Sequence, residues 1–382
     1  MEKKKILVTF VEAGNGHKVT AQAVVDALKL LNADNVEIIA SNLFANHKTL
    51  QKYEKFLINE VKKASSSPIH SNIQLASMHI LGSKNTLRFV NGCVFKRQRD
   101  LYIEQIKKIN PDVIIDTHYF CSYCSVTYRN NFNNNCKVIT YNPDNNVHGW
   151  WDRRVDKFVV NNNVAYQEAI KRGFSEEQLK QVFFLTREGI LNANLTKEEY
   201  RERNGIPQNQ FTVKLADGIY GQAKMKDFIY ELIKIKKPLT IIAIAGKNKK
   251  LYNELIDLKN NLPSNITLLP FGFVSNIHEL IKSSDLFITK GGPNAVLDGV
   301  LLEVPIIINY YANKIEKATK NLFIDHKECG LYIPNKKKAR AFVEQCIENQ
   351  SILNPYIKNE KKFDKSLNGG LQVAEFVLDV IK

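Results

Sequence analysis

The chain has 382 residues, 44% of them hydrophobic and 24% charged, a balance typical of a soluble globular protein large enough for two domains. No run approaches 18 apolar residues and the first residues lack a small-residue cleavage site, so we expect neither a transmembrane helix nor a signal peptide. The net charge of +15 indicates either an anionic partner, nucleic acid or an anionic membrane, or a genomic bias toward lysine, and composition alone does not choose between them.

Six cysteines are scattered along the chain, and two of them have the spacing of a metal or redox pair. Cys121 and Cys124 form a C-x-x-C, but no second pair stands nearby. We therefore interpret the cysteines as plain buried thiols in a reducing cytoplasm.

The positive charge of the first half of the chain is concentrated in residues 48–108, here called the basic window. It holds twelve lysines and arginines against four acids, a net charge of +8. Helical stretches near 48–63, 70–82 and 93–109 carry large apolar residues between the charges, a pattern that suits an anionic membrane surface. The alternative is a solvated helical face of a lysine-rich protein.

The chain begins with a predicted strand at 6–10 and a glycine turn. Gly14, Gly16 and His17 stand just before a predicted helix at 20–31, where an open α/β sheet binds its ligand. The third glycine of a dinucleotide fingerprint is missing, as is the ribose-binding acid, which disfavours an NAD-dependent oxidoreductase. The alternative for His17 is a capping or packing histidine.

Further strands are predicted at 36–40, 111–118, 137–141 and 156–160, the last closing the first domain. Thr117 and His118 end one strand, and the segment 143–151 that follows the next contains Asp144, His148 and Trp151. A helix is expected at 166–172. This alternation predicts one domain over residues 1–188.

A polar segment with glycine and proline, residues 188–209, indicates the hinge, and the strand–helix alternation then restarts. We expect strands at 211–216, 239–245, 267–270 and 286–289, with helices at 197–204, 225–236, 250–262 and 277–283. A turn at 217–221 contains Gly218 and Gly221. A final helix is expected at 371–381.

Residues 285–309 form the most informative segment, a βαβ unit with a glycine turn. Gly291, Gly292 and Pro293 separate the strand at 286–289 from a helix at 294–302, and a new strand starts at Ile306. Such a turn lets a phosphate approach the backbone at the positive end of the helix. Asp298, one turn into the helix, could accept hydrogen bonds from ribose hydroxyls. An ordinary βα turn is the alternative.

Several of these motifs together resemble those of one family. Thr289-Lys290-Gly291-Gly292 followed by Asp298 resembles its T-K-P-G-G turn and acidic helix, and Gly14 to His17 resembles its G-x-G-H turn. Phe273-Val274 matches its G-F-V segment. Asp144, His148 and Trp151 match its T-D-x-x-x-H-x-x-W segment, while Glu316, Lys317 and Asn321 match Q-E-K-x-x-x-N. The family comprises the monogalactosyldiacylglycerol synthases and processive diacylglycerol glucosyltransferases of glycosyltransferase family 28.

The resemblance implies a GT-B fold, two Rossmann-like α/β domains that face each other across a cleft. Residues 1–188 would bind the acceptor and the membrane, residues 189–365 would bind a UDP-sugar, and a terminal helix at about 366–382 would return to the first domain. The implied sites are catalytic His17, Asp144 and His148; donor-binding Gly218, Gly221, Phe273, Val274, Lys290, Gly291, Gly292, Asp298, Glu316 and Asn321; and acceptor or membrane residues Gly14, Gly16, His118, Trp151, Lys96, Arg97 and Arg99.

The implied activity is inverting transfer of a hexose, glucose or galactose, from a UDP-sugar to diacylglycerol or a related lipid, giving a β-glycolipid. By the same resemblance His17 is the candidate base, no metal or cofactor is needed, no nucleic acid is bound, and the protein sits on the inner face of the cell membrane. One departure bears on the sugar, because Ile315 stands where a glutamine usually contacts its hydroxyls. A catalytically weak, nucleotide-binding regulator at the membrane is the alternative.

Overall fold

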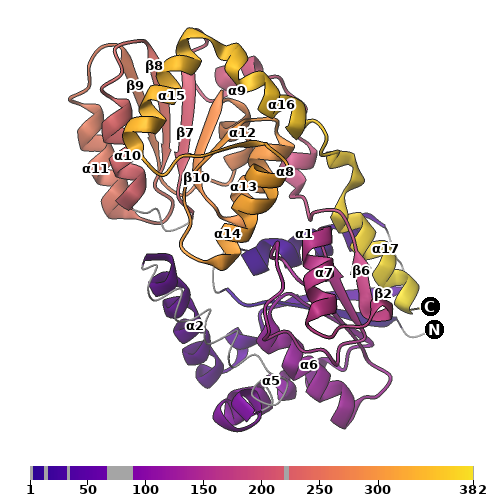
Figure 1. The fold of residues 1–382 in the computed structure, drawn as a ribbon. Coiled ribbons are helices and arrows are strands. Elements are labelled where there is room, and N and C mark those ends of the chain that lie inside the picture. The colour runs from indigo at the N-terminus through magenta and orange to yellow at the C-terminus, as the bar shows by residue number, and fades with distance from the viewer. Residues whose placement is uncertain (1–2, 13–15, 32–34, 67–88, 219–222, 382) are drawn as a thin grey trace. The chain divides into compact units, whose positions relative to one another are not determined.

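The computed structural model describes residues 3–12, 16–31, 35–66, 89–218 and 223–381 (Figure 1). They form two compact units, residues 1–187 with 367–382 and residues 188–366. Each unit is built on one six-stranded sheet, and all the strand pairs are parallel. This confirms the expected α/β class with two Rossmann-like sheets.

The first unit has the strand order β2-β1-β3-β4-β5-β6. Its strands are β1 (Lys4–Thr9), β2 (Val36–Ser41), β3 (Val113–Asp116), β4 (Lys137–Tyr141), β5 (Lys157–Val160) and β6 (Leu179–Gln181). Its α-helices are α1 (Gly16–Leu30), α2 (Lys48–Ser66), α5 (Lys96–Ile109), α6 (Tyr119–Phe132), α7 (Asn163–Lys171) and α17 (Gly369–Ile381), and shorter turns are η1 (Leu43–Asn46), η2 (Val90–Val94) and η3 (Glu176–Gln178).

Both faces of the first sheet are buried, because successive side chains of a strand point to opposite faces. In β1, Ile6 and Val8 pack against α1 and α17, whereas Leu7 packs against α2, α5 and α6. The terminal helix α17 (yellow in Figure 1) lies beside α1, and its Gln372 accepts a hydrogen bond from the backbone N–H of Phe183 at 2.6 Å. The last residues of the chain are thus part of the first unit's core.

The second unit has the strand order β12-β11-β10-β7-β8-β9. Its strands are β7 (Phe211–Ala216), β8 (Leu239–Ile244), β9 (Ile266–Phe271), β10 (Leu286–Lys290), β11 (Ile306–Tyr310) and β12 (Gly330–Tyr332). Its helices are α8 (Glu188–Leu191), α9 (Lys197–Arg203), α10 (Ala223–Leu232), α11 (Lys249–Lys259), α12 (Ile277–Lys282), α13 (Pro293–Leu301), α14 (Lys314–Lys320), η4 (Asn321–His326), α15 (Lys336–Glu348), η5 (Gln350–Leu353) and α16 (Asn354–Glu360), with η6 (Lys365–Leu367) at the boundary.

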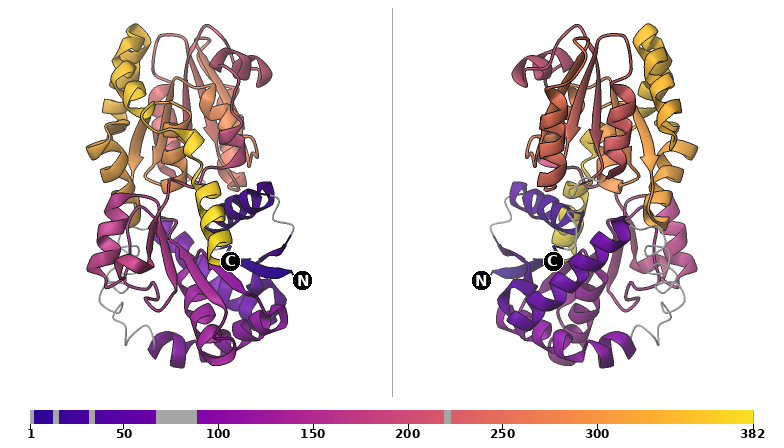
Figure 2. Two further views of the ribbon diagram at one scale, coloured as in Figure 1. Left: turned by 90° about the vertical axis from the view of Figure 1, so that its right-hand side faces the viewer. Right: turned by 90° about the vertical axis from the view of Figure 1, so that its left-hand side faces the viewer.

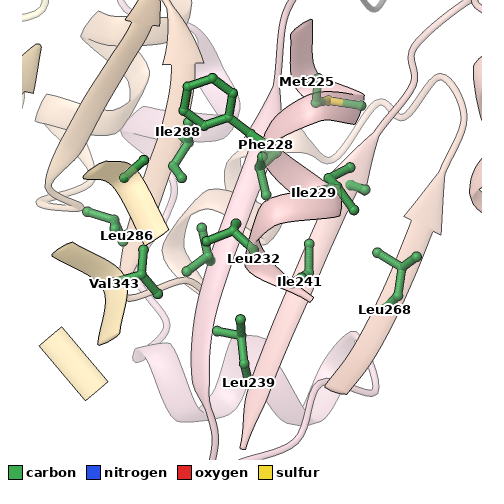
Figure 3. Packing of buried hydrophobic residues seen from close by; sticks show 14 of the residues in the cluster. Met225, Phe228, Ile229, Leu232, Leu239, Ile241, Leu268, Leu286, Ile288 and Val343 are labelled. Carbon is green, nitrogen blue, oxygen red and sulfur yellow. The ribbon is translucent and has the colours of Figure 1, made fainter. Parts of the chain in front are cut away.

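Helices cover both faces of the second sheet, as the two views of Figure 2 show. Figure 3 shows one layer of this core, where Phe228 and Leu232 of α10 point toward Ile241 of β8 and Ile288 of β10. Val343 of α15 closes the same cluster. The carboxyl ends of these strands therefore extend from a sheet whose alternate side chains are buried in one hydrophobic cluster.

Two expectations from the sequence need correction. The strand at 157–160 is not the last of the first unit, because β6 pairs with it and forms the edge of the sheet. Cys93 is exposed, so only five of the six cysteines are buried thiols. The predicted helix at 70–82 lies outside the described residues. Among the described helices, none is long and apolar enough to cross a membrane.

Candidate active site

Each sheet has one topological switch point, where the chain reverses the direction in which it adds strands. In the first unit it lies between β1 and β3, and in the second unit between β7 and β10. Ligands of open α/β sheets bind beyond the carboxyl ends of the strands at this point. The predicted site residues His17 and His118 follow β1 and β3. Lys290 is the last residue of β10, and Gly218 follows β7. Each unit thus carries one candidate subsite.

His17, in the first turn of α1, is held by the end of β3. Its Nδ1 lies 2.5 Å from the carbonyl oxygen of Thr117, and the Thr117 hydroxyl donates a 3.2 Å hydrogen bond to the carbonyl of His17. A carbonyl only accepts, so Nδ1 carries the hydrogen and Nε2 keeps its lone pair. Burial lowers the pKa of His17 to about 4, although the bond to Thr117 opposes this. The imidazole is therefore neutral near pH 7, with Nε2 available to accept a proton.

Two further histidines follow His17 in a series of ring contacts. His118 meets the His17 ring edge-on at 4.9 Å, and Tyr119 links His118 at 4.1 Å to His148 at 5.7 Å. Nδ1 of His118 accepts the N–H of Phe120, and Nδ1 of His148 accepts that of Trp150. Burial, with the charges of the other two histidines, lowers the pKa of His118 well below its ordinary value. Of the three, His17 is the one whose Nδ1 serves as donor.

The segment after β4 brings Asp144, His148 and Trp151 to the same edge of the sheet. Burial raises the pKa of Asp144 to about 7, so this carboxyl changes charge near neutral pH. Trp151 is buried, stacks on His148 at 5.2 Å and meets Phe158 at 5.6 Å. Its ring therefore orients His148 from within the core. Gly16 is the first residue of α1, and Gly14 lies outside the described residues.

In the second unit, glycines surround the side chain of Lys290. Gly218 has φ 79°, and a Cβ there would lie 3.1 Å from Cε of Lys290. A Cβ on Gly291 would lie 2.7 Å from the carbonyl oxygen of Glu316, whereas one on Gly292 would meet nothing closer than Cε of Lys290 at 3.8 Å. Gly218 is thus favoured by its positive φ and Gly291 by packing, whereas a Cβ on Gly292 would make only an ordinary van der Waals contact at the start of α13. Gly221 lies outside the described residues.

An ion pair ties this edge together. Nζ of Lys290 lies 2.6 Å from Oε1 of Glu316, while Oε2 accepts the N–H of Ala312 at 2.7 Å. The N–H of Glu316 is capped by the side chain of Asn313 at the start of α14. The carboxylate of Glu316 therefore accepts from one side chain, Lys290, and from one backbone N–H, that of Ala312. The pair fixes the position of the Lys290 ammonium beside the glycine turn.

The start of α13 supplies backbone N–H groups that can donate hydrogen bonds. Gly292 is its N-cap and Pro293 its first residue, and Val296 donates to the carbonyl of Gly292. The N–H groups of Asn294 and Ala295 therefore have no partner within the helix. Asp298 lies buried in the second turn of the same helix.

The remaining predicted donor residues lie on either side of the switch point. Phe273 and Val274 follow β9, the edge strand, and the ring of Phe273 is 60% exposed with Nζ of Lys247 5.5 Å from its centroid. Asn321 is half-buried at the end of α14, one turn beyond Glu316. An exposed ring two strands from β7 could stack on a nucleotide base.

The cations of the basic window differ in their exposure and in their partners. Lys96 and Arg97 begin α5, are exposed, and form no ion pair among the described residues. Both line a groove of about 520 Å³, together with the apolar side chains of Val94 and Leu101 and the acids Asp100 and Glu104. Arg99 instead donates to Asp100 and to the carbonyl of Gly92, and its side chain is only 17% exposed. Arg99 therefore holds η2 against α5. Val94, in the same groove, exposes 59% of its surface, and Phe89, just before η2, exposes 62%.

Three residues at these edges were missed by the motif search. Thr117 sets the tautomer of His17, and Asp217 and Asn309 form a buried 3.3 Å hydrogen bond beside Lys290. An acid directly after a buried strand, as in Asp217, was the one available signal. Among the described residues, no group of three or more histidines, cysteines or acids could hold a metal ion.

Two family models together match most of the chain. Residues 17–182 match the family model described as monogalactosyldiacylglycerol (MGDG) synthase, and residues 220–366 match the glycosyltransferase family 28 C-terminal domain. Monogalactosyldiacylglycerol synthase 2, chloroplastic, of Arabidopsis thaliana is 21% identical over 396 residues, with 99% of this chain and 80% of the relative covered. Processive diacylglycerol beta-glucosyltransferase of Bacillus pumilus is 25% identical over 338 residues, with 85% and 82% covered.

A solved structure shares the whole architecture. The crystal structure of a glycosyltransferase from Rickettsia africae aligns with a TM-score of 0.58 at 17% identity, and 100% of both chains is covered. At this identity the likeness shows the fold, which is GT-B. With both halves matched by family models, the chain belongs to the GT-B glycosyltransferases that resemble the monogalactosyldiacylglycerol synthases and the processive diacylglycerol glucosyltransferases.

Proposed function

We propose that this protein is an inverting glycosyltransferase that moves a hexose, glucose or galactose, from a UDP-sugar to diacylglycerol or a related lipid at a membrane surface. The relatives are named for diacylglycerol acceptors, and both of their family domains are present in this chain. The product would be a β-glycolipid, because a single direct displacement inverts the anomeric carbon of an α-linked donor.

The observation that carries the proposal is the tautomer of His17. Sugar transfer to a hydroxyl needs a group that accepts the hydroxyl proton as the new bond forms. His17 is neutral and its Nδ1–H is engaged with Thr117, so Nε2 is the atom that would accept this proton. Asp144, whose pKa burial raises to about 7, is the second candidate base, and His148 would help to orient the acceptor.

The donor would bind at the switch point of the second unit. The N–H groups of Asn294 and Ala295, which have no partner within α13, and the ammonium of Lys290 would oppose the charge that develops on the departing diphosphate. Phe273 and Val274 would contact the base, Asp298 the ribose, and Glu316 and Asn321 the sugar side. Metal-independent transfer is part of the proposal, and turnover that persists in EDTA would test it.

The basic window would bind the membrane surface. Lys96 and Arg97 are exposed cations in one groove with the exposed side chain of Val94, and Phe89, one residue before η2, is exposed as well. Exposed cations with exposed apolar side chains are the combination by which a peripheral protein binds an anionic surface without a spanning helix. On this proposal the protein works at the cytoplasmic face of the membrane.

The second candidate function is that of a catalytically weak regulator that binds a nucleotide on the same fold. Ile315 motivates it, because an apolar side chain at this half-buried position offers no hydrogen bond to a sugar hydroxyl. Both functions predict nucleotide binding, so turnover separates them.

The deciding experiment incubates the purified protein with diacylglycerol in anionic vesicles and a panel of UDP-sugars, and identifies the lipid product by mass spectrometry and its anomer by NMR. Formation of a β-glycosyl lipid from one UDP-sugar supports the enzyme. UDP binding without any glycolipid product over the full panel would favour the regulator. An α-linked product would refute the inverting mechanism.

A further inference from the structure

A buried acid has no role in the function described so far. It lies at the carboxyl ends of β7, β10 and β11, where the nucleotide sugar is proposed to bind, and this part of the second sheet is here called the donor edge. Asp217 directly follows β7 and is only 3% exposed. It accepts a 3.3 Å hydrogen bond from Nδ2 of Asn309 and another from the backbone N–H of Lys290. Among the described residues, the ionisable groups that act on it are Lys290 from β10, Tyr310 from β11 and Glu316 from α14.

The charges at this edge do not favour an anion in the free protein. Asp217 and Glu316 are two carboxyl groups beside one ammonium, and Glu316 already pairs with that ammonium at 2.6 Å. The diphosphate of a nucleotide sugar brings two more negative charges. In a site of low polarity, neighbouring negative charges raise the pKa of a carboxyl group, and the group with the highest pKa takes up a proton first.

A second observation indicates that a ligand completes this edge. Asn309 is 1% exposed, and its amide oxygen has no hydrogen-bond partner among the described residues. Buried polar atoms almost always have partners, so an unsatisfied acceptor beside Asp217 fits a surface that a polar ligand covers. Gly218, with φ 79°, follows Asp217 directly and leaves the backbone there without a side chain.

We propose that Asp217 is a further donor-binding residue: when the nucleotide sugar binds, Asp217 takes up one proton from solvent and, as the neutral acid, donates a hydrogen bond to the diphosphate. The inference rests on the proposed donor site. Neutralisation leaves one carboxylate paired with Lys290 and removes the repulsion between Asp217 and the phosphates.

The electrostatics of the free protein support this assignment. Burial raises the pKa of Asp217 to about 6, and the charge of Glu316 adds to the rise. The hydrogen bond from Asn309, the charge of Lys290 and the hydrogen bond from the Lys290 backbone act against it. A bound diphosphate raises this pKa further. Proton uptake is then expected between about pH 6 and the higher pKa of the complex, and affinity falls as pH rises through that window.

The test measures binding of UDP-glucose and UDP-galactose to the full chain by titration calorimetry, without acceptor, in imidazole, HEPES and Tris at pH 7. A nucleotide sugar is the right probe because its diphosphate has no group that titrates near pH 7, whereas the terminal phosphate of UDP titrates near about 6. Heats that vary with the ionisation enthalpy of the buffer report the protons taken up. Each series is run with EDTA and again with Mg²⁺.

Wild-type protein is expected to take up between about half a proton and one proton per donor bound, with affinity falling by at most about tenfold per pH unit from pH 6 to 8. Asp217→Asn keeps the size of the side chain and the acceptor for Asn309, and it is expected to bind without proton uptake and with an affinity independent of pH. Asp227→Asn, which removes an exposed acid from α10, is the matched control and is expected to behave as wild type.

Heats that do not depend on the buffer in the wild type would overturn the inference, and this measurement needs no variant to fold. Unchanged uptake in Asp217→Asn would also overturn it. Binding that requires Mg²⁺ and takes up no proton would overturn it too. In that case a cation that bridges the carboxylates and the diphosphate would offset the negative charge in place of the proton. If the wild type binds neither nucleotide sugars nor UDP, the proposed donor site itself fails.

Discussion

Nζ of Lys290 and Oε1 of Glu316 lie 2.6 Å apart, and this largely buried ion pair joins the end of β10 to α14. The second oxygen of Glu316 accepts the N–H of Ala312, just beyond β11. The ends of two neighbouring strands and the start of a helix therefore share one carboxylate, so the shape of the donor edge depends on this pair.

The first prediction concerns the stability of the second unit. Lys290→Met leaves the carboxylate of Glu316 buried without its cation, and we expect a loss of about 3–5 kcal/mol in the free energy of unfolding. The double variant with Glu316→Gln should recover part of it. Urea unfolding is followed by circular dichroism, because both tryptophans lie in the first unit. Lys237→Met, in the exposed pair with Glu348, is the control and should change little. A single variant as stable as wild type would contradict the prediction.

The two glycines of the β10–α13 turn should respond differently to alanine. In Gly291→Ala the new methyl would lie 2.7 Å from the carbonyl of Glu316, so we expect destabilisation by about 1–3 kcal/mol. In Gly292→Ala the nearest atom is 3.8 Å away and φ is −66°, so the protein should fold as wild type. If the diphosphate approaches this turn, Gly292→Ala should weaken UDP binding by at least about tenfold, or 1.4 kcal/mol. Calorimetry with unchanged UDP affinity would move the diphosphate elsewhere.

Replacing the candidate base should separate binding from turnover. His17→Ala is expected to keep the affinity for UDP, because His17 belongs to the other unit, and to lose about 10²–10⁴ in kcat. His326→Ala, an exposed histidine on η4, is the matched control and should retain full activity. Because the pKa of His17 is about 4, its protonation should not reduce activity in the wild type above about pH 5. Near-normal turnover in His17→Ala would pass the role to Asp144.

The raised pKa of Asp144 makes stability depend on pH. The folded protein keeps the Asp144 proton up to about pH 7, whereas an unfolded chain releases it near about 4, so this group lowers stability as pH rises between those values. Asp144→Asn removes the effect and should stabilise the first unit at pH 8 by up to about 4 kcal/mol. Tryptophan fluorescence in urea at pH 5 to 8 measures it. A difference between variant and wild type that stays constant with pH would refute the assignment.

Membrane binding should depend on two exposed cations. Lys96→Glu with Arg97→Glu removes two attractions of about 1 kcal/mol each and adds two repulsions, so sedimentation with anionic vesicles should fall at least about tenfold. Arg99 is left unchanged because it pairs with Asp100. Lys249→Glu with Lys250→Glu on α11 makes the same charge change and is the control. Equal sedimentation of wild type with zwitterionic and anionic vesicles would reduce the basic window to a solvated surface.

Local patterns were enough to predict most of the sheet. The buried strands β4 and β7 have the predicted bounds, because a parallel strand covered on both faces is a continuous apolar run between polar residues. The edge strands β6 and β12 were missed, since three-residue strands with exposed side chains carry no such run. The helix α6 was missed as well. Its residues from Phe120 to Val126 are buried on all sides, so they lack the 3.6-residue period of a half-exposed helix.

The sequence by itself determined where the polar turns stand, because glycines and single polar residues after apolar strands mark the carboxyl edge of a parallel sheet. Only the tertiary structure decided what those residues do. The tautomer of His17 depends on a carbonyl 100 positions away, and the cation that Glu316 pairs with lies 26 positions away. Asp217 became notable only when the fold buried it beside Asn309 and Glu316, and this burial, together with the charge of Glu316, raises its pKa. Protonation states arise from desolvation and from neighbours in space, and neither is encoded in the local pattern of residues.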